Sequence, residues 1–460
     1  MRARSLVATA LALSFASAVA FADEAEEPRR VAPVHARHET TLEQCLAAAE
    51  ANYPKVHESM AQLERMRAQL LEAQTAPYSG FTAWAGVALA PTVAGTAIYS
   101  PNTDATITSS MALAWQAGIS GAIPLWTFGK ITAAREAATA QVKVGEHATR
   151  KAKNEVRLTV RQAYYGVLLA RDGQALLDEA LARVEKYEPP LEEKVKAGDG
   201  DEIQLLKLKI QHAELQARKS EAMKQERIAL AGLRFVTGLG PGLEVPNHPL
   251  RRVRHVLGPL AQYLTAARLF RPEINMARAG VLARRAQVEL ERARFFPDLA
   301  LALSASRSYA PEVADQLNPF VRDEANYVRY AAGLVMSWSL DFLPRAARLA
   351  QAEAQLEEIR ATERYALGGV GVEVETAYAE AEDAEKRLDA YTTAVRYAKQ
   401  WLVKVQQGID VGTYEDEDIV DPAKEYALKR FLQMSATLDY DMALAKLSLA
   451  TGWDAVNPGE

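Results

Sequence analysis

The stretch Asp298-Leu-Ala-Leu-Ala-Leu-Ser-Ala-Ser306 alternates large apolar residues with small ones at a period of two. In an extended chain, successive side chains point to opposite sides, so the leucines share one face and the alanines and serines share the other. Such alternation predicts a β-strand with two chemically different faces. Its length also matches a tilted strand that crosses a bilayer, which takes about 9–11 residues.

Three other segments show the same alternation. We predict strands at about 78–90, 109–121, 298–309 and 328–340, grouped as two hairpins. If these strands lie in a membrane, their large apolar side chains should face lipid. The predicted lipid-facing residues are Leu113, Trp115, Leu299, Leu301, Leu303, Leu334, Met336 and Trp338. Aromatic girdles at the membrane interfaces would draw on Trp84, Trp115, Trp126, Tyr330 and Trp338.

The chain also repeats itself. Val160-Arg-Gln-Ala-Tyr-Tyr165 recurs as Val374-Glu-Thr-Ala-Tyr-Ala379, and Leu233-Arg-Phe-Val-Thr-Gly238 recurs at the same spacing as Leu447-Ser-Leu-Ala-Thr-Gly452. Separated matches at one constant offset indicate internal duplication. We therefore predict a first repeat at 41–238, a linker at 239–257 that is rich in Pro and Gly, a second repeat at 258–452 and a tail at 453–460.

Each repeat is mainly helical outside its hairpin. A helix at about 41–76 should open the first repeat, and longer helices should span 130–188 and 345–407, each about 90 Å long. The Gly368–Gly371 cluster should interrupt the last of these, and Pro189-Pro190 should kink the first long helix. Helices this long need lateral partners. The predicted fold class is α+β, mainly α, with two helix–hairpin–helix repeats.

Composition and the N-terminus limit the functional classes. Residues 1–22 read as a secretory signal peptide, followed by a leader segment at 23–40. No later stretch is apolar for 18 residues, as a membrane-spanning helix would require. The formal charge of −5 and the absence of a basic patch argue against nucleic acid. The single cysteine, Cys45, excludes an internal disulfide and is expected to be a buried small side chain.

The strands leave several architectures open. Four strands cannot close a barrel, and hydrocarbon does not tolerate open sheet edges, so a membrane location requires other copies of the chain. The alternatives are a soluble sandwich, or a periplasmic coiled-coil adaptor or scaffold without a membrane barrel. An enzyme is disfavoured because no nucleophile triad order, phosphate loop or paired-carboxylate pocket occurs. His35-Ala-Arg-His38 has a possible chelating spacing, but it lies in the leader segment and is expected to be an ordinary surface segment. We therefore predict no catalytic residue, no cofactor and no metal site.

The order of these features resembles the TolC-like outer-membrane efflux proteins over nearly the whole chain. The resemblance rests on the following segments: Leu42–Pro54, Arg271-Pro-Glu-Ile274, Pro77, Phe296-Pro297, Ile123–Gly129, Ala163-Tyr164, Ala377-Tyr378, Gly198 and Gly412. It implies a homotrimer in the bacterial outer membrane, with a twelve-stranded barrel above a periplasmic α-helical barrel. It also implies a periplasmic adaptor and an inner-membrane pump or ABC secretion ATPase as partners, with the loops at 91–109 and 310–326 facing outside.

The resemblance further assigns functional roles to the helix-to-helix turns. Gly198, Gly412 and Thr413 would form adaptor-docking turns at the periplasmic tip, where glycine suits a backbone with positive φ. Asp418 and Asp421 match the family's acids after the second turn and would ring the periplasmic aperture. The alternative is a solvated helix N-terminus, where carboxylates are favoured by the helix dipole.

Overall fold

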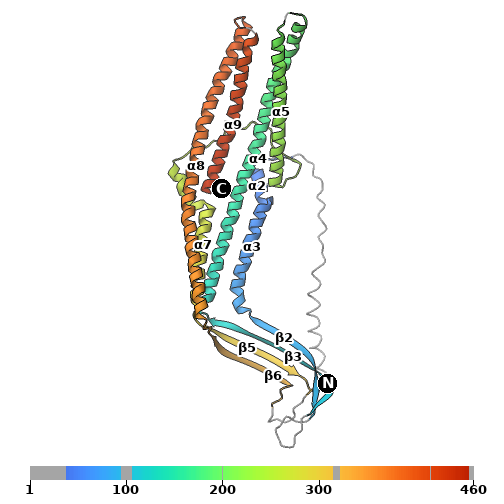
Figure 1. Ribbon diagram of the computed structural model, residues 1–460, viewed down its shortest axis with the longest axis vertical. Helices are drawn as coiled ribbons and strands as arrows, with labels where there is room; N and C mark the ends of the chain where they lie inside the picture. Colours follow the sequence, from blue (N-terminus) through green and yellow to red (C-terminus); the bar gives the residue numbers. More distant parts are fainter. Residues whose placement is uncertain (1–37, 95–105, 199, 314–321, 415, 455–460) are drawn as a thin grey trace.

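The computed structural model describes residues 38–94, 106–198, 200–313, 322–414 and 416–454. The following parts lie outside these residues: the predicted signal peptide, most of the predicted leader segment, parts of the two loops predicted to face outside, and the end of the C-terminal tail. The described chain is mainly helical. A four-stranded sheet with strands from both halves lies at one end, and two long helical hairpins reach the other end (Figure 1).

The two halves have the same order of elements, as predicted. The first half contains α2 (Leu42–Asn52), α3 (Pro54–Thr75), η1 (Ala76–Tyr78), β2 (Phe81–Ala94), β3 (Thr106–Trp126), α4 (Lys130–Lys196) and α5 (Glu202–Thr237). The second contains α6 (Leu260–Phe270), α7 (Pro272–Ala293), β5 (Asp298–Tyr309), β6 (Tyr327–Ser337), α8 (Phe342–Asp410), η2 (Asp416–Ile419) and α9 (Val420–Thr451). A short parallel pair, β1 (His38–Glu39) with β4 (Leu243–Glu244), ties the start of the described chain to the linker.

The four long strands form one antiparallel sheet in the order β2-β3-β5-β6. β3 is longer than the predicted 109–121 because β5 lies beside its last residues, pairing Ile123 with Leu301 and Trp126 with Leu299. A bulge between Pro124 and Trp126 accommodates the proline, which has no amide hydrogen to donate. The Ile123–Gly129 segment therefore begins inside the strand rather than after it.

The long helices are continuous where interruptions were expected. The prediction of a break at Gly368–Gly371 is wrong: α8 runs unbroken from Phe342 to Asp410. Each interior glycine costs about 1 kcal/mol of helix propensity, but Val370 and Val374 are buried in the core beside the cluster, and this packing outweighs the cost. α4 also continues through Pro189 and Pro190 to Lys196, and the kink at these prolines stays a prediction. None of the described helices has both the length and the apolarity needed to cross a membrane.

The expected helix at 41–76 is divided. Tyr53 has an extended backbone (φ −70°, ψ 124°) between α2 and α3, because the proline that follows disfavours a helical conformation for this residue. Arg271, before Pro272, does the same between α6 and α7 (φ −64°, ψ 122°). Both openings thus bend at an X-Pro corner, which lets each short helix pack where its own long helices meet.

Each half has its own hydrophobic core at mid-height of the molecule. The first core contains Cys45, Val160, Tyr164 and Leu233. The second contains Tyr263, Val374, Ala377 and Leu447. Cys45 is fully buried, as expected, and burial raises the pKa of its thiol to about 11. The repeated sequence segments are therefore the residues that build the two cores.

Candidate functional site

The sheet has two different faces. Side chains directly opposite each other on antiparallel strands lie on the same face, so the register assigns every strand residue. We call one side the apolar face; its large members are Phe81, Val87, Leu89, Met111, Leu113, Trp115, Ile119, Ile123, Leu299, Leu301, Leu303, Tyr309, Val328, Tyr330, Leu334 and Met336. Leu334 and Met336 are 68% and 66% exposed, so this chain alone does not cover them.

Seven of the eight residues predicted to face lipid belong to this apolar face. Trp338 lies one residue beyond β6, where its indole Nε1 donates to the Phe295 carbonyl at 3.0 Å. It also packs edge-to-face on Phe342, in the junction between strand and helix. The register thus brings the predicted residues of both hairpins onto one continuous surface.

The opposite side, the small-residue face, consists largely of Ala, Ser, Gly and Thr. Trp84 is one of its bulky exceptions: it lies opposite Gly118, and its ring occupies the space that a side chain at position 118 would need. Trp84 therefore does not share a face with Trp115 and Tyr330, and its assignment to the same aromatic girdle is wrong. The alternation itself contains this information, because Trp84 falls between Ala83 and Ala85 of the apolar face.

Aromatic side chains also gather where the sheet meets the helices. Phe128 stacks on Phe296 at 5.3 Å and makes an edge contact with Trp126. Phe128 and Gly129 both have positive φ, which turns the chain sharply from β3 into α4. Lys130 fastens this corner by donating to the Phe296 carbonyl and pairing with Asp298 at 2.8 Å. An aromatic belt of this kind suits a membrane interface.

The two helical turns lie at the end of the molecule opposite the sheet (Figure 1). Gly198 and Gly412 have φ of +83° and +76°, the left-handed conformation expected for glycine there. The amide of Thr413 donates to the Gly408 carbonyl at 2.7 Å, which closes the second turn. The ring of Tyr414 lies against Gly408, where any side chain would overlap it.

The predicted aperture acids follow this second turn. Asp418 lies in η2 and Asp421 in the first turn of α9, and both are exposed. In the other hairpin, Asp201 caps α5 by accepting from the Ile203 amide at 2.8 Å, and Glu202 occupies its first turn. Both hairpins therefore carry carboxylates beside a helix N-terminus at the same end of the molecule.

A long apolar groove of about 1790 Å³ separates the two helical hairpins. Its walls include Leu177 of α4, Leu215 of α5, Leu402 of α8 and Phe431 of α9. Sequence reasoning missed this groove because each helix alone only shows which residues are apolar. The relative placement of the hairpins decides which of those residues remain uncovered.

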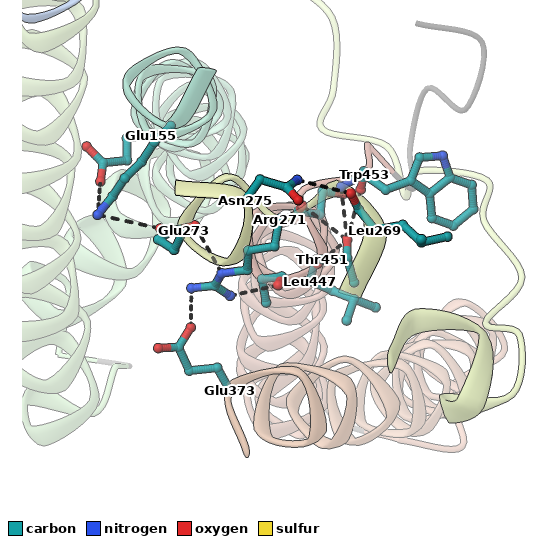
Figure 2. Close-up of polar contacts among 12 residues, drawn as sticks. Glu155, Leu269, Arg271, Glu273, Asn275, Glu373, Leu447, Thr451 and Trp453 are labelled. Atoms are coloured by element: carbon teal, nitrogen blue, oxygen red, sulfur yellow. Dashed lines mark hydrogen bonds and ion pairs between the residues drawn. The ribbon is translucent and has the colours of Figure 1, made fainter. Parts of the chain in front are cut away.

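A charged network crosses the molecule at the level of the cores (Figure 2). Arg271 is buried; its Nη1 donates to the Ala450 carbonyl at 2.7 Å, its Nη2 pairs with Glu373, and its Nε contacts Glu273 at 3.2 Å. Glu273 also contacts Lys151 of α4 at 3.5 Å. The network thus joins α7, α8 and α9 of the second repeat to α4 of the first.

Two carboxylates, one half-buried and one buried, hold the linker across both repeats. Asp172 of α4 accepts from the Leu250 amide at 2.8 Å, and Asp441 of α9 accepts from the Val253 amide at 3.0 Å. Burial raises the pKa of both carboxyls, that of Asp441 to about 7, against the lowering effect of these amide hydrogen bonds. Sequence reasoning missed both residues, because an isolated aspartate on a helix gives no sign of its partner.

The comparisons with known proteins agree with this architecture. The sequence matches the family described as outer membrane efflux protein over residues 45–239 and 264–453, so the chain belongs to this family. The duplicated match corresponds to the two repeats. No curated protein matches the sequence significantly.

Solved structures with similar folds cover nearly the whole chain. A membrane protein from Pseudomonas aeruginosa is 20% identical, with 91% of each chain covered and a TM-score of 0.71. The CmeC outer membrane channel of Campylobacter jejuni is 17% identical, covering 91% of this chain and 87% of its own, with a TM-score of 0.72. The open state of the MtrE outer membrane channel of Neisseria gonorrhoeae is 18% identical, covering 90% and 89%, with a TM-score of 0.72.

The family match decides between the predicted functions. The protein is an outer membrane efflux protein rather than a periplasmic scaffold, and its fold is that of the TolC-like channels.

Proposed function

We propose that three copies of this chain form a passive exit duct for efflux, with a closed barrel in the outer membrane and a helical tunnel in the periplasm. The observation that carries this proposal is the sheet. In the described sheet, β2 and β6 each pair on one side only, while the apolar face is exposed. Unpaired backbone groups in hydrocarbon cost several kcal/mol each, so the β2 edge of one copy should pair with the β6 edge of the next.

The helices support the same assembly. α3 and α5 lie on the β2 side of the molecule, and α8 lies on the β6 side (Figure 1). Helices on both sides carry large exposed side chains: Phe235 of α5 is 68% exposed, and Tyr365 of α8 is 82% exposed. Packing α8 of one copy against α3 and α5 of the next would cover apolar surface that one chain leaves exposed, which favours a ring over a monomer.

The helical turns support the proposed partners. We infer that a periplasmic adaptor docks at the turns containing Gly198, Gly412 and Thr413, and that an inner-membrane pump supplies the energy. Asp418 and Asp421 would place carboxylates around the periplasmic aperture and favour cations there. The chain itself would catalyse no reaction.

The detergent-corrected mass of the extracted protein, measured together with its membrane fraction, tests the assembly directly. We expect a trimer in the outer-membrane fraction. A soluble monomer or dimer would contradict the duct and revive a packed, non-membrane sheet.

A pair of substitutions on one strand tests the face assignment. Leu334→Arg places a charge on the apolar face and should prevent assembly, because arginine at the bilayer midplane costs about 2–4 kcal/mol in each copy. Ala331→Arg makes the same change on the small-residue face and should be tolerated if that face lines a wet lumen. Equal tolerance of both variants in outer-membrane fractions would refute the assignment.

The aperture is tested with neutral substitutions. Asp418→Asn combined with Asp421→Asn should lower the cation selectivity of single channels in planar bilayers. The matched control is Glu202→Gln, an acid in the first turn of the other hairpin. If the control changes selectivity equally, Asp421 acts only as an ordinary helix N-terminal acid.

A further inference from the structure

Two arginines lie in adjacent positions of the sheet but on opposite faces. Arg307 of β5 pairs in register with Val328, and Arg329 of β6 pairs with Ser306, so the two side chains lie at nearly the same height. Arg329, on the small-residue face, pairs with Glu324 at 2.8 Å and lies 3.8 Å from the centre of the Tyr327 ring. Arg307, on the apolar face, has no carboxylate partner among the described residues.

Arg307 also has no charged neighbour on its own face of the described sheet. Among the strand residues that the structure describes, it is the only charged side chain on the apolar face. Asp298, the one acid among the described residues of the four long strands, lies on the other face and pairs with Lys130. Two described acids of the loop before β6 are engaged elsewhere: Asp323 accepts from the Ala325 and Asn326 amides, and Glu324 pairs with Arg329.

The position of Arg307 along the strand places its charge near the outer rim of the apolar face. Arg307 is eight residues beyond Leu299, which pairs with Trp126 of the aromatic belt near the helices. Eight residues extend about 26 Å, or about 20 Å in height at a tilt of about 40°, against an apolar band of about 25 Å. A long side chain that starts at this depth can reach the interface.

The side chain does extend in that direction. The guanidinium lies 5.7 Å from the centre of the Trp115 ring and 5.9 Å from that of Tyr309. Trp115 and Tyr309 lie opposite each other on β3 and β5. Tyr309 is two residues farther along β5 from the helices than Arg307. The arginine thus points away from the helices, between two aromatic residues of the kind that favour a membrane interface.

We propose that Arg307, flanked by Trp115 and Tyr309, binds the phosphate group of an anionic lipid in the outer leaflet. An unpaired charge on a lipid-facing surface requires a counter-ion, and the planar guanidinium matches phosphate oxygens in a bidentate, charge-assisted contact. The inference rests on the proposed function, in which the apolar face contacts lipid and the strand ends remote from the helices face outward.

Native mass spectrometry of the detergent-extracted protein, titrated with bisphosphorylated lipid A, tests this site. We expect the wild-type trimer to retain the lipid, and Arg307→Gln to weaken binding on the order of tenfold, as for the loss of one charge-assisted contact. Arg329→Gln is the matched control, because it removes an arginine at the same height from the other face. It should change lipid binding less than about twofold.

Further arms separate the explanations. Dephosphorylated lipid A should bind the wild-type trimer as weakly as the bisphosphorylated lipid binds Arg307→Gln, and this comparison stands even if that variant does not assemble. Millimolar inorganic phosphate should not displace the lipid; displacement would indicate an anion site without lipid specificity and would overturn the proposal. Equal lipid binding by wild type and Arg307→Gln would also overturn it. A wild-type protein that is not trimeric would instead contradict the proposed function.

Discussion

The two repeats have corresponding hydrophobic cores, but the polar contacts around these cores differ. Leu233 and Leu447 occupy corresponding positions, and both are fully buried. In the first repeat, Asn52 Nδ2 donates to the Thr237 carbonyl at the end of α5, at 2.9 Å. In the second, Arg271 donates to the Ala450 carbonyl near the end of α9. The final carbonyls of a helix need donors, and either an amide or a guanidinium can supply them.

The surroundings of the two corners differ accordingly. At the first corner, Tyr53 forms an edge-to-face contact with Phe235. The ion pairs beside it stay within the first repeat, because Glu50 pairs with Arg157 at 2.5 Å and Lys55 pairs with Glu155 at 3.0 Å, both in α4. Arg271 instead joins Glu373 and Glu273, and through Glu273 it reaches Lys151 of the other repeat. The comparison indicates that duplicated apolar positions maintain the shape, whereas the polar contacts have specialised to join the repeats.

If the two cores are equivalent, the same substitution at corresponding positions should lower the free energy of unfolding by the same amount. Leu233→Ala and Leu447→Ala each remove a fully buried side chain, and each should lower the free energy of unfolding by about 3–5 kcal/mol. Urea unfolding of the detergent-solubilised protein, followed by circular dichroism, measures both. A difference larger than about 2 kcal/mol between the variants would show that the cores are not equivalent.

The two carboxylates that hold the linker should contribute unequally to the pH dependence of stability. The unfolded Asp441 carboxyl loses its proton near its ordinary pKa of about 4, whereas the folded one keeps its proton until about pH 7. This group's contribution to stability is therefore full below about pH 4 and decreases as the pH rises to about 7.

Asp441→Asn should remove this slope and stabilise the protein relative to wild type by about 2–4 kcal/mol at about pH 8. The side chain faces Arg252 of the linker and Tyr165 of α4, which are unchanged in the variant. Asp172→Asn should flatten the profile less, because Asp172 is less buried. Parallel pH profiles for wild type and Asp441→Asn would contradict the assignment.

Substitutions at the two X-Pro corners should also lower stability by different amounts. Arg271→Ala removes a buried, charge-assisted donor and should destabilise the protein by about 2–3 kcal/mol. Asn52→Ala removes a single neutral hydrogen bond and should cost about 1 kcal/mol. Thermal unfolding of both variants in the same detergent provides the comparison. If Asn52→Ala were the more damaging change, the corner of the first repeat would depend more strongly on its hydrogen bond than that of the second.

The smallest effects should come from the turns, where the repeats are again alike. Gly198→Ala and Gly412→Ala force a side chain into the left-handed region and should each cost about 1 kcal/mol. No atom lies within 4 Å of a methyl group built at either position, so strain alone should decide the result. Matching shifts in the thermal midpoint would support this, and a large excess for either variant would indicate an added contact at that turn.

Local patterns in the sequence were sufficient for the elements and their faces. The alternation around Leu301 defines the strand and its two surfaces, because side chains of an extended chain alternate whatever their partners are. The repeated segments around Val160 and Val374 revealed the duplication, because the same helix packing requires the same apolar positions. The positive φ of Gly198 and Gly412 was likewise readable, since few other residues adopt it.

Other features depended on contacts between residues that are distant in the sequence. The pairing of Ile123 with Leu301 extends β3 beyond its predicted end. Core packing keeps α8 helical through its glycines. Asp441 has its amide partner because the linker lies beside α9. The isolation of Arg307 from carboxylates also emerged only with the register. The sequence by itself determined which surfaces are apolar, because that chemistry is local; the tertiary structure decided which groups face each other, because burial and pairing energies depend on the whole fold.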